Sequence, residues 1–411
     1  MKCKGFELGV MLVLGLAAAA SVCAQDEDCG KNHYILDAPV CAVQALDVPI
    51  GAPGAIAVTA GGDVYFSVPN LIFKVAGDGS LTRVAGGIAP GFAGDGGPAS
   101  QALLNFPTWY PERLHDPIDF NELVAPLALD AQGNLYVGDA YNNRIRRIDT
   151  HGVITTIVGN GDLNGARGWN DNGVQALDAG LWWPQGVAVD TSGNILIADS
   201  GGLIDRVLPD GRVFHLAVNN CGRPQDEGLC APAGIAVDRA GAVYATDMSC
   251  TVQRFGGGAV ANGTYAGRTL TGPGWGAWWD GPCGYSGDGG LATSAKLAWP
   301  IGMAADTLGN LFIADSYNHC VRKVDPAGVI TTYAGACGTQ LRVDGVAIAG
   351  THYSGDGGPA TAALLDTPHG VAVDAAGNVY IADTGNLRIR KVTAAGIITT
   401  IAGNGNDLPL Q

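Results

Sequence analysis

The sequence is poor in charge, and basic residues are the scarcer kind. Only 15% of its 411 residues are charged, with 23 Lys and Arg against 38 Asp and Glu, and the formal net charge is −15. Proteins that bind nucleic acid neutralise its phosphates with clustered Lys and Arg. We therefore expect no nucleic-acid partner. The negative charge favours solubility and does not identify a ligand.

Long apolar stretches are missing beyond the start of the chain. Residues 10–20 form an apolar run after a short basic segment, and small residues around Cys23 follow it. This order is typical of a secretory signal peptide, so we predict that residues 1–24 are removed before Gln25. Lipoprotein processing at Cys23 is the alternative. No later run is long enough to span a bilayer, and we expect a secreted or periplasmic protein without a membrane span.

No pair of cysteines has the CxxC spacing that is typical of zinc sites. Beyond the predicted signal peptide the cysteines are Cys29, Cys41, Cys221, Cys230, Cys250, Cys283, Cys320 and Cys337. An even number in an exported chain favours disulfides over zinc. Cys29 with Cys41 and Cys221 with Cys230 are close enough in sequence for local bridges, although other pairings remain open.

Glycine is abundant, with 63 residues, and it separates short runs of Val, Ile, Tyr and Thr. The clearest unit covers residues 368–403 and reads PHGVAVD, GNVYIAD, RIRKV and ITTIAG in that order. The same order recurs, with more or less variation, in units that begin at Pro53, Pro126, Pro184, Pro232 and Pro300. The chain therefore contains six copies of one unit.

Each copy holds four short β-type runs separated by turn residues such as Asp-x-x-Gly-Asn. Four strands at this period are the signature of a propeller blade, and one such sheet must stack on neighbours to bury its faces. We predict an all-β fold, a six-bladed β-propeller over residues 51–403 with four antiparallel strands per blade. Short helical turns are expected in the links between blades. Residues 25–50 are expected to assist ring closure, and residues 404–411 form a C-terminal tail.

These residues resemble a known family. The pattern P-x-G-V-A-V-D, G-N-x-Y-I-A-D and R-I-R-K-V is similar to the NHL repeat over residues 51–403. The resemblance implies a six-bladed propeller of the TolB-like class. A linking motif, Gly-Asp-Gly-Gly-x-Ala, occurs in 94–107, 287–300 and 355–368 and in altered form in 171–184. This motif resembles the teneurin-type and bacterial secreted NHL subgroup.

An aspartate ends the second strand of five copies, and an arginine follows seven residues later. The pairs are Asp139 and Arg146, Asp199 and Arg206, Asp247 and Arg254, Asp315 and Arg322, and Asp383 and Arg390. A pair that recurs in nearly every copy cannot mark one unique site. We interpret it as structural, with each aspartate accepting turn N–H groups or meeting its arginine across the adjacent strand.

Each Gly-Asp-Gly-Gly link carries one further aspartate, Asp95, Asp288 or Asp356. Calcium needs many oxygen ligands, which a single carboxylate per loop does not supply. Glycine with a positive φ in a tight turn explains the motif without metal. We therefore predict no cofactor, with calcium or zinc as the alternatives.

Enzymes also occur in this class of propeller. Resemblance to the amidating lyases would place zinc-binding histidines at the middle residue of Pro-x-Gly, facing the channel, and catalytic zinc commonly takes three protein ligands. Here those positions hold Leu127, Gln185, Ala233, Ile301 and His369. With a single histidine, we do not expect that lyase and favour a non-enzymatic role. The alternative is a metal-assisted hydrolase or lyase at the central channel, with His369, Gln185 and loop residues such as His115 or Asp116 converging.

Insertions that interrupt the repeat are the best candidates for specificity, because loops on a rigid scaffold concentrate binding residues. They are residues 108–125, 268–284 and 336–352. Exposed aromatic rings suit sugar faces and protein hot spots, although rings can also pack under their own loop. We hypothesise a monomeric scaffold whose rim loops bind protein or carbohydrate. Its candidate binding residues are Trp109, His115, Gln185, Trp275, Trp278, Trp279 and His369.

Overall fold

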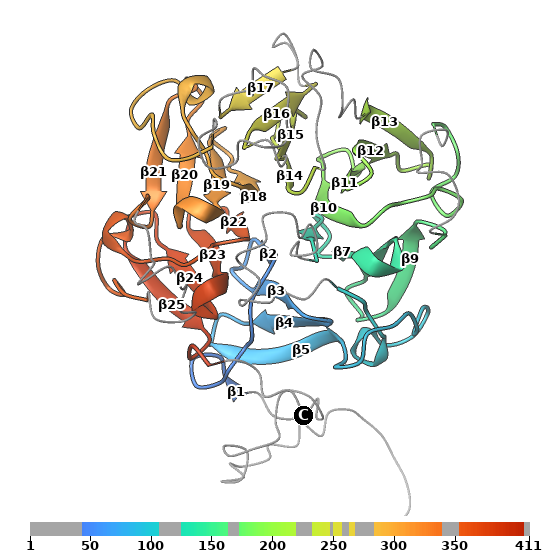
Figure 1. Ribbon diagram of the computed structural model, residues 1–411. Helices are drawn as coiled ribbons and strands as arrows, with labels where there is room; N and C mark the ends of the chain where they lie inside the picture. Colours follow the sequence, from blue (N-terminus) through green and yellow to red (C-terminus); the bar gives the residue numbers. More distant parts are fainter. Residues whose placement is uncertain are drawn as a thin grey trace, which may run out of the picture. The chain divides into compact units, whose positions relative to one another are not determined.

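The computed structural model describes residues 43–106, 125–162, 172–218, 232–246, 250–256, 263–267, 283–338 and 353–406. By its contacts the chain divides into two units, Met1–Cys41 and Ala42–Gln411, and every described residue belongs to the second. This second unit contains six β-sheets arranged round a ring (Figure 1). The predicted all-β, six-bladed propeller is therefore confirmed.

Each sheet is one blade, with four antiparallel strands that follow the sequence from the centre outwards. Blade one carries an additional outer strand, β1 (Val43–Gln44), which pairs with β5. The other strands are, blade by blade, β2 (Ile56–Val58), β3 (Val64–Val68), β4 (Leu71–Val75) and β5 (Ser80–Gly86); β6 (Leu127–Leu129), β7 (Leu135–Asp139), β8 (Arg144–Ile148) and β9 (Ile154–Val158); β10 (Pro184–Val189), β11 (Ile195–Asp199), β12 (Leu203–Val207) and β13 (Val213–Val218); β14 (Ile235–Val237), β15 (Val243–Thr246), β16 (Val252–Phe255) and β17 (Gly263–Ala266); β18 (Pro300–Ala305), β19 (Leu311–Asp315), β20 (Cys320–Val324) and β21 (Ile330–Ala334); and β22 (Val371–Val373), β23 (Val379–Asp383), β24 (Arg388–Val392) and β25 (Ile398–Ala402).

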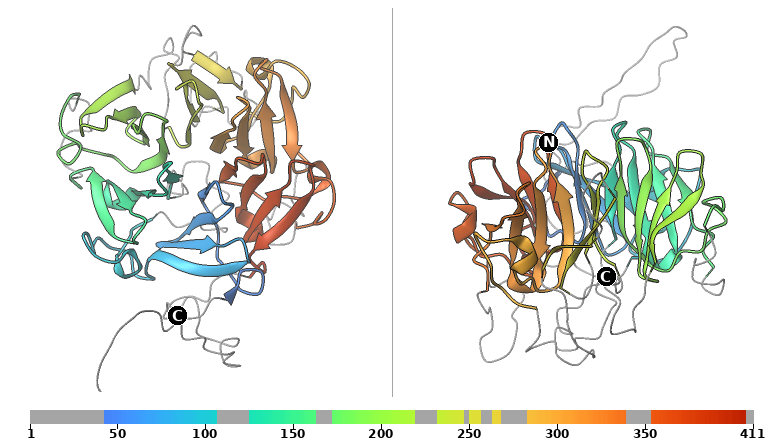
Figure 2. Two further views of the ribbon diagram at one scale, coloured as in Figure 1. Left: turned by 180° about the vertical axis from the view of Figure 1, so that it is seen from behind. Right: turned by 90° about the horizontal axis from the view of Figure 1, so that it is seen from above.

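The first strand of each blade lines the centre of the ring. In ring order these strands are β2, β6, β10, β14, β18 and β22, each in contact with the next, and β22 contacts β2. The view from behind shows the same closed arrangement, with the red sixth blade beside the blue first blade (Figure 2). Residues at the start of these strands therefore meet around one channel.

The core lies between the blades, because each sheet is covered on both faces. All five residues of β23 are buried, as the nearly continuous apolar runs in the sequence predict. Between blades five and six, Phe312 and Ala314 of β19 pack with Val371 and Ile381. No strand pair joins one described sheet to another, so neighbouring sheets meet through side chains and not through a shared strand ladder.

Short helical turns lie in the links and confirm that prediction. Three 3-10 turns lie in the Gly-Asp-Gly-Gly links, η1 (Ala99–Gln101), η4 (Ala292–Ser294) and η6 (Ala360–Ala362), and three follow second strands, η3 (Ala140–Asn142), η5 (Ser316–Asn318) and η7 (Thr384–Asn386). Gly94 in the first link has a φ of 92°, and a Cβ there would lie 2.7 Å from the Cα of Ala102. This turn therefore requires glycine. Among the described residues, none of the helices could cross a membrane.

Hydroxyl groups at the ends of second strands bridge to the next blade. Three of these bridges are made by Ser67, Thr246 and Ser316. In the last blade, Thr384 Oγ1 donates to the carbonyl oxygen of Pro53 at 2.7 Å, across 331 positions in sequence. The backbone N–H of Gly403 donates to the carbonyl oxygen of Ala45 at 2.8 Å. The segment before β2 thus joins the last blade to the first.

Candidate functional site

The Pro-x-Gly units bring their middle residues to one end of the channel. Each glycine lies against the next blade: a Cβ at Gly302 would lie 2.2 Å from the carbonyl oxygen of His369, and a Cβ at Gly234 would lie 1.9 Å from that of Ile301. Real Cβ atoms do not approach backbone so closely. Close contact between neighbouring blades therefore requires glycine here, and it fixes the residue before each glycine beside the channel.

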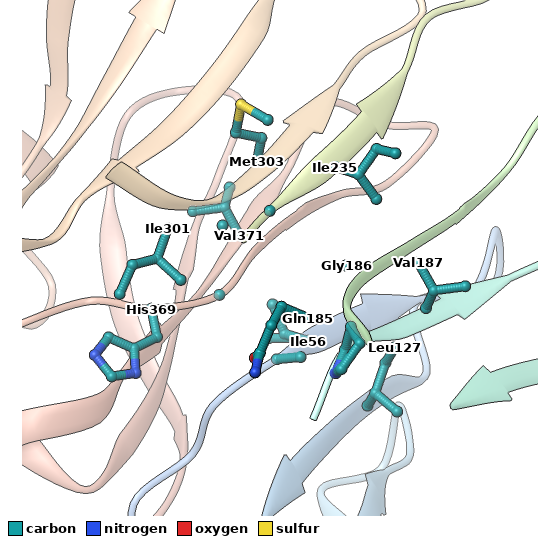
Figure 3. A pocket seen from close by; sticks show the side chains of 15 residues that line it. Ile56, Leu127, Gln185, Gly186, Val187, Ile235, Ile301, Met303, His369 and Val371 are labelled. Carbon is teal, nitrogen blue, oxygen red and sulfur yellow. The ribbon is translucent and has the colours of Figure 1, made fainter. Parts of the chain in front are cut away.

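A cavity lies at this end of the channel, with about 60 Å³ of room for the centres of water molecules. Its walls come from all six blades and are mostly apolar, with Ile56, Leu127 and Met303 among them. None of the described residues that line it carries a formal charge at neutral pH. Gln185 of β10 and His369, which precedes β22, supply the polar side chains (Figure 3).

Both polar side chains are buried, and each has one polar atom without a hydrogen-bond partner among the described residues. Gln185 is 5% exposed and His369 is 2% exposed. Within the part of the chain that the structure describes, Gln185 Oε1 and His369 Nδ1 have no hydrogen-bond partner. The His369 backbone is fixed, since its N–H donates to the carbonyl oxygen of Ala382 at 3.1 Å. Buried polar atoms without partners cost free energy, so these two atoms call for an explanation.

The imidazole of His369 is neutral at physiological pH. Burial lowers the pKa of His369 to about 4, and the negative charge of Asp366 opposes that shift. A neutral imidazole has one N–H donor and one acceptor nitrogen, and a carboxamide has both donors and an acceptor. The cavity can therefore exchange hydrogen bonds with a ligand without offering it a charge.

The structure brings two of the sequence-predicted site residues together, Gln185 and His369 in one cavity. The others, Trp109, His115, Trp275, Trp278 and Trp279, lie outside the described residues. In the described ranges, no group of three or more His, Cys, Asp and Glu side chains is arranged to hold a metal ion.

The link aspartates form ion pairs with buried arginines. Arg390 has no exposed side-chain surface and lies between two carboxylates, 2.8 Å from Asp356 of the link and 3.1 Å from Asp383 of β23. The equivalent sets are Asp95, Arg146 and Asp139 in blade two, and Asp288, Arg322 and Asp315 in blade five. We call these three sets the Asp–Arg–Asp clamps. In these three blades the clamps confirm the predicted contact between the strand aspartate and its arginine, whereas the link aspartate is a second partner that the spacing of the repeat did not predict. Asp247 of the fourth blade lies outside the described residues.

The strand aspartates of the clamps also hold the backbone of the link. Asp383 Oδ1 accepts the N–H of Asp366 at 2.7 Å, and Asp139 Oδ1 accepts that of Asn105 at 2.8 Å. Burial raises the pKa of both aspartates to about 6, and their arginines oppose this shift. Each clamp thus fastens a link to its own blade through charge and backbone contacts together.

Two disulfides lie in the described part of the chain, Cys250–Cys283 and Cys320–Cys337. They confirm that the cysteines form disulfides. Cys320 lies in the third strand of blade five and Cys250 lies two residues before that of blade four, and each is joined to a link that leads to the next blade. The local pairs expected from the sequence, Cys29 with Cys41 and Cys221 with Cys230, lie outside the described residues.

Comparison with family models places the repeats in a known family. A model of the NHL repeat matches residues 181–202 and 297–324, and a model of the teneurin NHL domain matches residues 346–409. The two NHL matches begin just before β10 and β18, the first strands of blades three and five. Each of these two matches therefore begins where a blade begins. The chain is an NHL-repeat β-propeller.

Relatives of this NHL-repeat propeller include much longer proteins. It is 26% identical to mouse teneurin-4 over 72% of this chain and 8% of teneurin-4, and 26% identical to Drosophila melanogaster teneurin-m over 89% of this chain and 13% of teneurin-m. The chain therefore spans a small part of these relatives. A crystal structure of a Bacteroides thetaiotaomicron protein of unknown function is similar in fold, with a TM-score of 0.56 and 17% identity over 85% of this chain and 71% of that chain.

Blade three of the NHL-repeat propeller departs from the clamp. In the clamp blades the arginine pairs with the middle residue of the second strand. In blade three that position, opposite Ile197, holds Asp205, and Arg206 lies one residue further on. Asp199 instead accepts the backbone N–H groups of Trp182 and Gly201, each at 2.6 Å, which is the other role expected of these aspartates.

The aspartate in the arginine position, Asp205, changes the charges inside blade three. Asp205 Oδ1 lies 2.6 Å from His215 Nδ1, and both side chains are largely buried. Burial, together with the negative charge of Asp205, raises the pKa of Asp199 to about 8. Asp199 is therefore mostly protonated at neutral pH, unlike an ordinary aspartate.

Proposed function

We propose that this protein is an exported binding scaffold whose rim loops bind a protein or a carbohydrate. The observation that carries the proposal is the contrast between regular, clamped blades and the aromatic insertion at 268–284. That insertion contains Trp275, Trp278 and Trp279. Loops on a rigid frame concentrate binding residues, and tryptophan is enriched among the residues that dominate binding energy.

Export is part of this proposal. Disulfides such as Cys250–Cys283 persist in oxidising compartments and are rare in the cytosol. The signal-like segment 1–24 supports the same location. We expect mass spectrometry of the exported protein to find Gln25 at its N-terminus. An N-terminal lipid on Cys23 would instead support lipoprotein processing, and Met1 on the exported protein would contradict both.

The channel hydrolase or lyase considered from the sequence is not proposed. Among the described residues that line the cavity, His369 is the sole side chain of the types that bind zinc, whereas catalytic zinc usually has three protein ligands. The described lining residues therefore support a neutral hydrogen-bonding edge.

The test is a binding screen with the mature protein. Residues 25–411 are presented, under non-reducing conditions, to a glycan array and to an array of extracellular protein domains. We expect reproducible binding to a small, chemically related set of features. Loss of this binding after reduction and heat unfolding is the control for specificity. Failure to bind any feature on either array would overturn the proposal.

A further inference from the structure

The channel cavity contains two polar side chains, Gln185 and His369, that the packing of the blades does not require. The equivalent residue after the opening proline is apolar in three other blades, where Leu127, Ala233 and Ile301 take the places of Gln185 and His369. These blades have the same four strands, and Gly234 and Gly302 make the same close contact with the next blade. Propeller geometry is therefore satisfied by an apolar residue at this position.

Burial without partners makes Gln185 and His369 unfavourable as purely structural residues. Gln185 Oε1 and His369 Nδ1 are enclosed and form no hydrogen bond within the described residues. Proteins rarely leave such atoms unpaired unless a ligand, an ion or water satisfies them. Both side chains line the same cavity (Figure 3), so a molecule bound there lies beside both.

We infer that the channel cavity is a binding site for a small uncharged ligand with an amide-type edge. Such an edge has a hydrogen-bond donor beside an acceptor, which matches a carboxamide and a neutral imidazole. The ligand's apolar part would lie against Ile56, Met303 and the other aliphatic walls. The cavity also suits the amide end of a longer molecule.

Charge complementarity excludes ionic ligands from this site. The described residues around the cavity offer no carboxylate, ammonium or guanidinium group to pair with an ion. Moving an unpaired charge out of water into such a site is strongly unfavourable. Acetate and methylammonium are therefore matched negative probes for acetamide, because they have similar size and differ in charge.

The experiment uses acetamide as the probe and the seven histidines as reporters. The full chain is labelled with ¹³Cε1-histidine, and the His369 signal is assigned by its loss in His369→Leu. We expect acetamide to shift the His369 signal in a saturable way with a millimolar Kd, and acetate and methylammonium to leave it unchanged. Gln185→Met should weaken acetamide about tenfold, because one hydrogen bond is lost.

A matched control separates binding from folding. Gln132 is exposed in a turn of blade two, so Gln132→Met makes the same chemical change away from the cavity and should bind acetamide like the wild type. We expect Gln185→Met to unfold at the same temperature as the wild type or higher, since it removes an unsatisfied buried group. A less stable Gln185→Met with unchanged acetamide affinity would show that the glutamine is structural. No saturable shift with acetamide, or an equal shift with acetate, would overturn the inference. Neither result depends on whether the rim loops bind a partner.

Discussion

Single residues distinguish one blade from another at the positions where the repeat varies. The family resemblance implied that Gln185 and His369 lie beside the channel, because both are the middle residue of a Pro-x-Gly unit. Their lack of hydrogen-bond partners could not be predicted, since it depends on side chains from the other blades that meet only in the closed ring. The rim residues such as Trp278 stay predictions.

The buried imidazole of His369 makes the stability of the protein depend on pH. Its pKa falls from the ordinary value of 6.5 to about 4 on folding, so the unfolded state binds a proton more readily. The contribution is fully present above about pH 6.5 and is lost as pH falls towards 4. It amounts to about 3 kcal/mol at most. Urea unfolding of wild type and His369→Leu at several pH values measures this difference.

The comparison with a variant is necessary because other groups act in the opposite direction. Asp315 and Asp383 have pKa values raised by burial to about 6, so their protonation favours the folded state as pH falls. These contributions are common to both proteins and cancel in the difference. A stability difference between wild type and His369→Leu that stays constant from pH 7 to pH 4 would contradict the assignment of a neutral, buried imidazole.

At the scale of elements, the Asp–Arg–Asp clamps decide how the links lie on the blades. The order of the motifs along the chain already indicates that each link aspartate pairs with a clamp arginine. The three Gly-Asp-Gly-Gly links precede the three blades that carry a clamp arginine, and in the altered link Asn172 supplies the amide oxygen that accepts the N–H of His215. Counting from Asp199 to Arg206 failed in blade three because the pairing register there puts Asp205 in the arginine position.

Removing a clamp arginine should strongly destabilise the protein. Arg390→Met leaves Asp356 and the fully buried Asp383 without their counter-charge, and breaking a buried pair from one side costs about 3–5 kcal/mol. The matched control is Arg212→Met, which removes an arginine from an exposed pair with Asp210. The urea concentration at the midpoint of unfolding should fall strongly for Arg390→Met and stay unchanged for Arg212→Met. Equal midpoints for the two variants would refute the clamp.

The glycine of Pro-x-Gly should tolerate no side chain. A Cβ at Gly302 would lie 2.2 Å from the carbonyl oxygen of His369, whereas at Gly77 no atom lies within 4 Å. We expect Gly302→Ala to destabilise the protein by about 1–3 kcal/mol through strain between blades five and six. Gly77→Ala should be neutral or slightly stabilising. Thermal unfolding of the two variants tests this, and a tolerated Gly302→Ala would rule out close packing of the blades.

The whole molecule follows from counting copies. Six units with four strands each predict six blades, because each sheet must have both of its faces covered, one by each neighbouring sheet. The contacts that close the ring between the last blade and the first were harder to predict from the sequence. Thr384 and Pro53 occupy ordinary repeat positions, and only the closed ring brings the last blade to the first.

Ring closure gives a prediction at this scale. Thr384→Val keeps the shape of the side chain but leaves the buried carbonyl oxygen of Pro53 without the hydroxyl, which should cost about 1–3 kcal/mol. Thr331, which is exposed on β21, provides the control variant Thr331→Val. Denaturant titration should show a lower midpoint for Thr384→Val alone. Identical midpoints would mean that this hydrogen bond does not contribute to closure.

The central claim is that a stable ring carries a separable binding surface on its rim. The most direct measurement is the affinity of the wild type and of Trp278→Ala/Trp279→Ala for the ligand found on the arrays, with unfolding midpoints measured in parallel. The exposed Leu308→Ala is the control. We predict that the tryptophan variant loses at least about tenfold in affinity, while its unfolding midpoint and the affinity of Leu308→Ala stay at the wild-type values. Unchanged affinity in the tryptophan variant would contradict the claim.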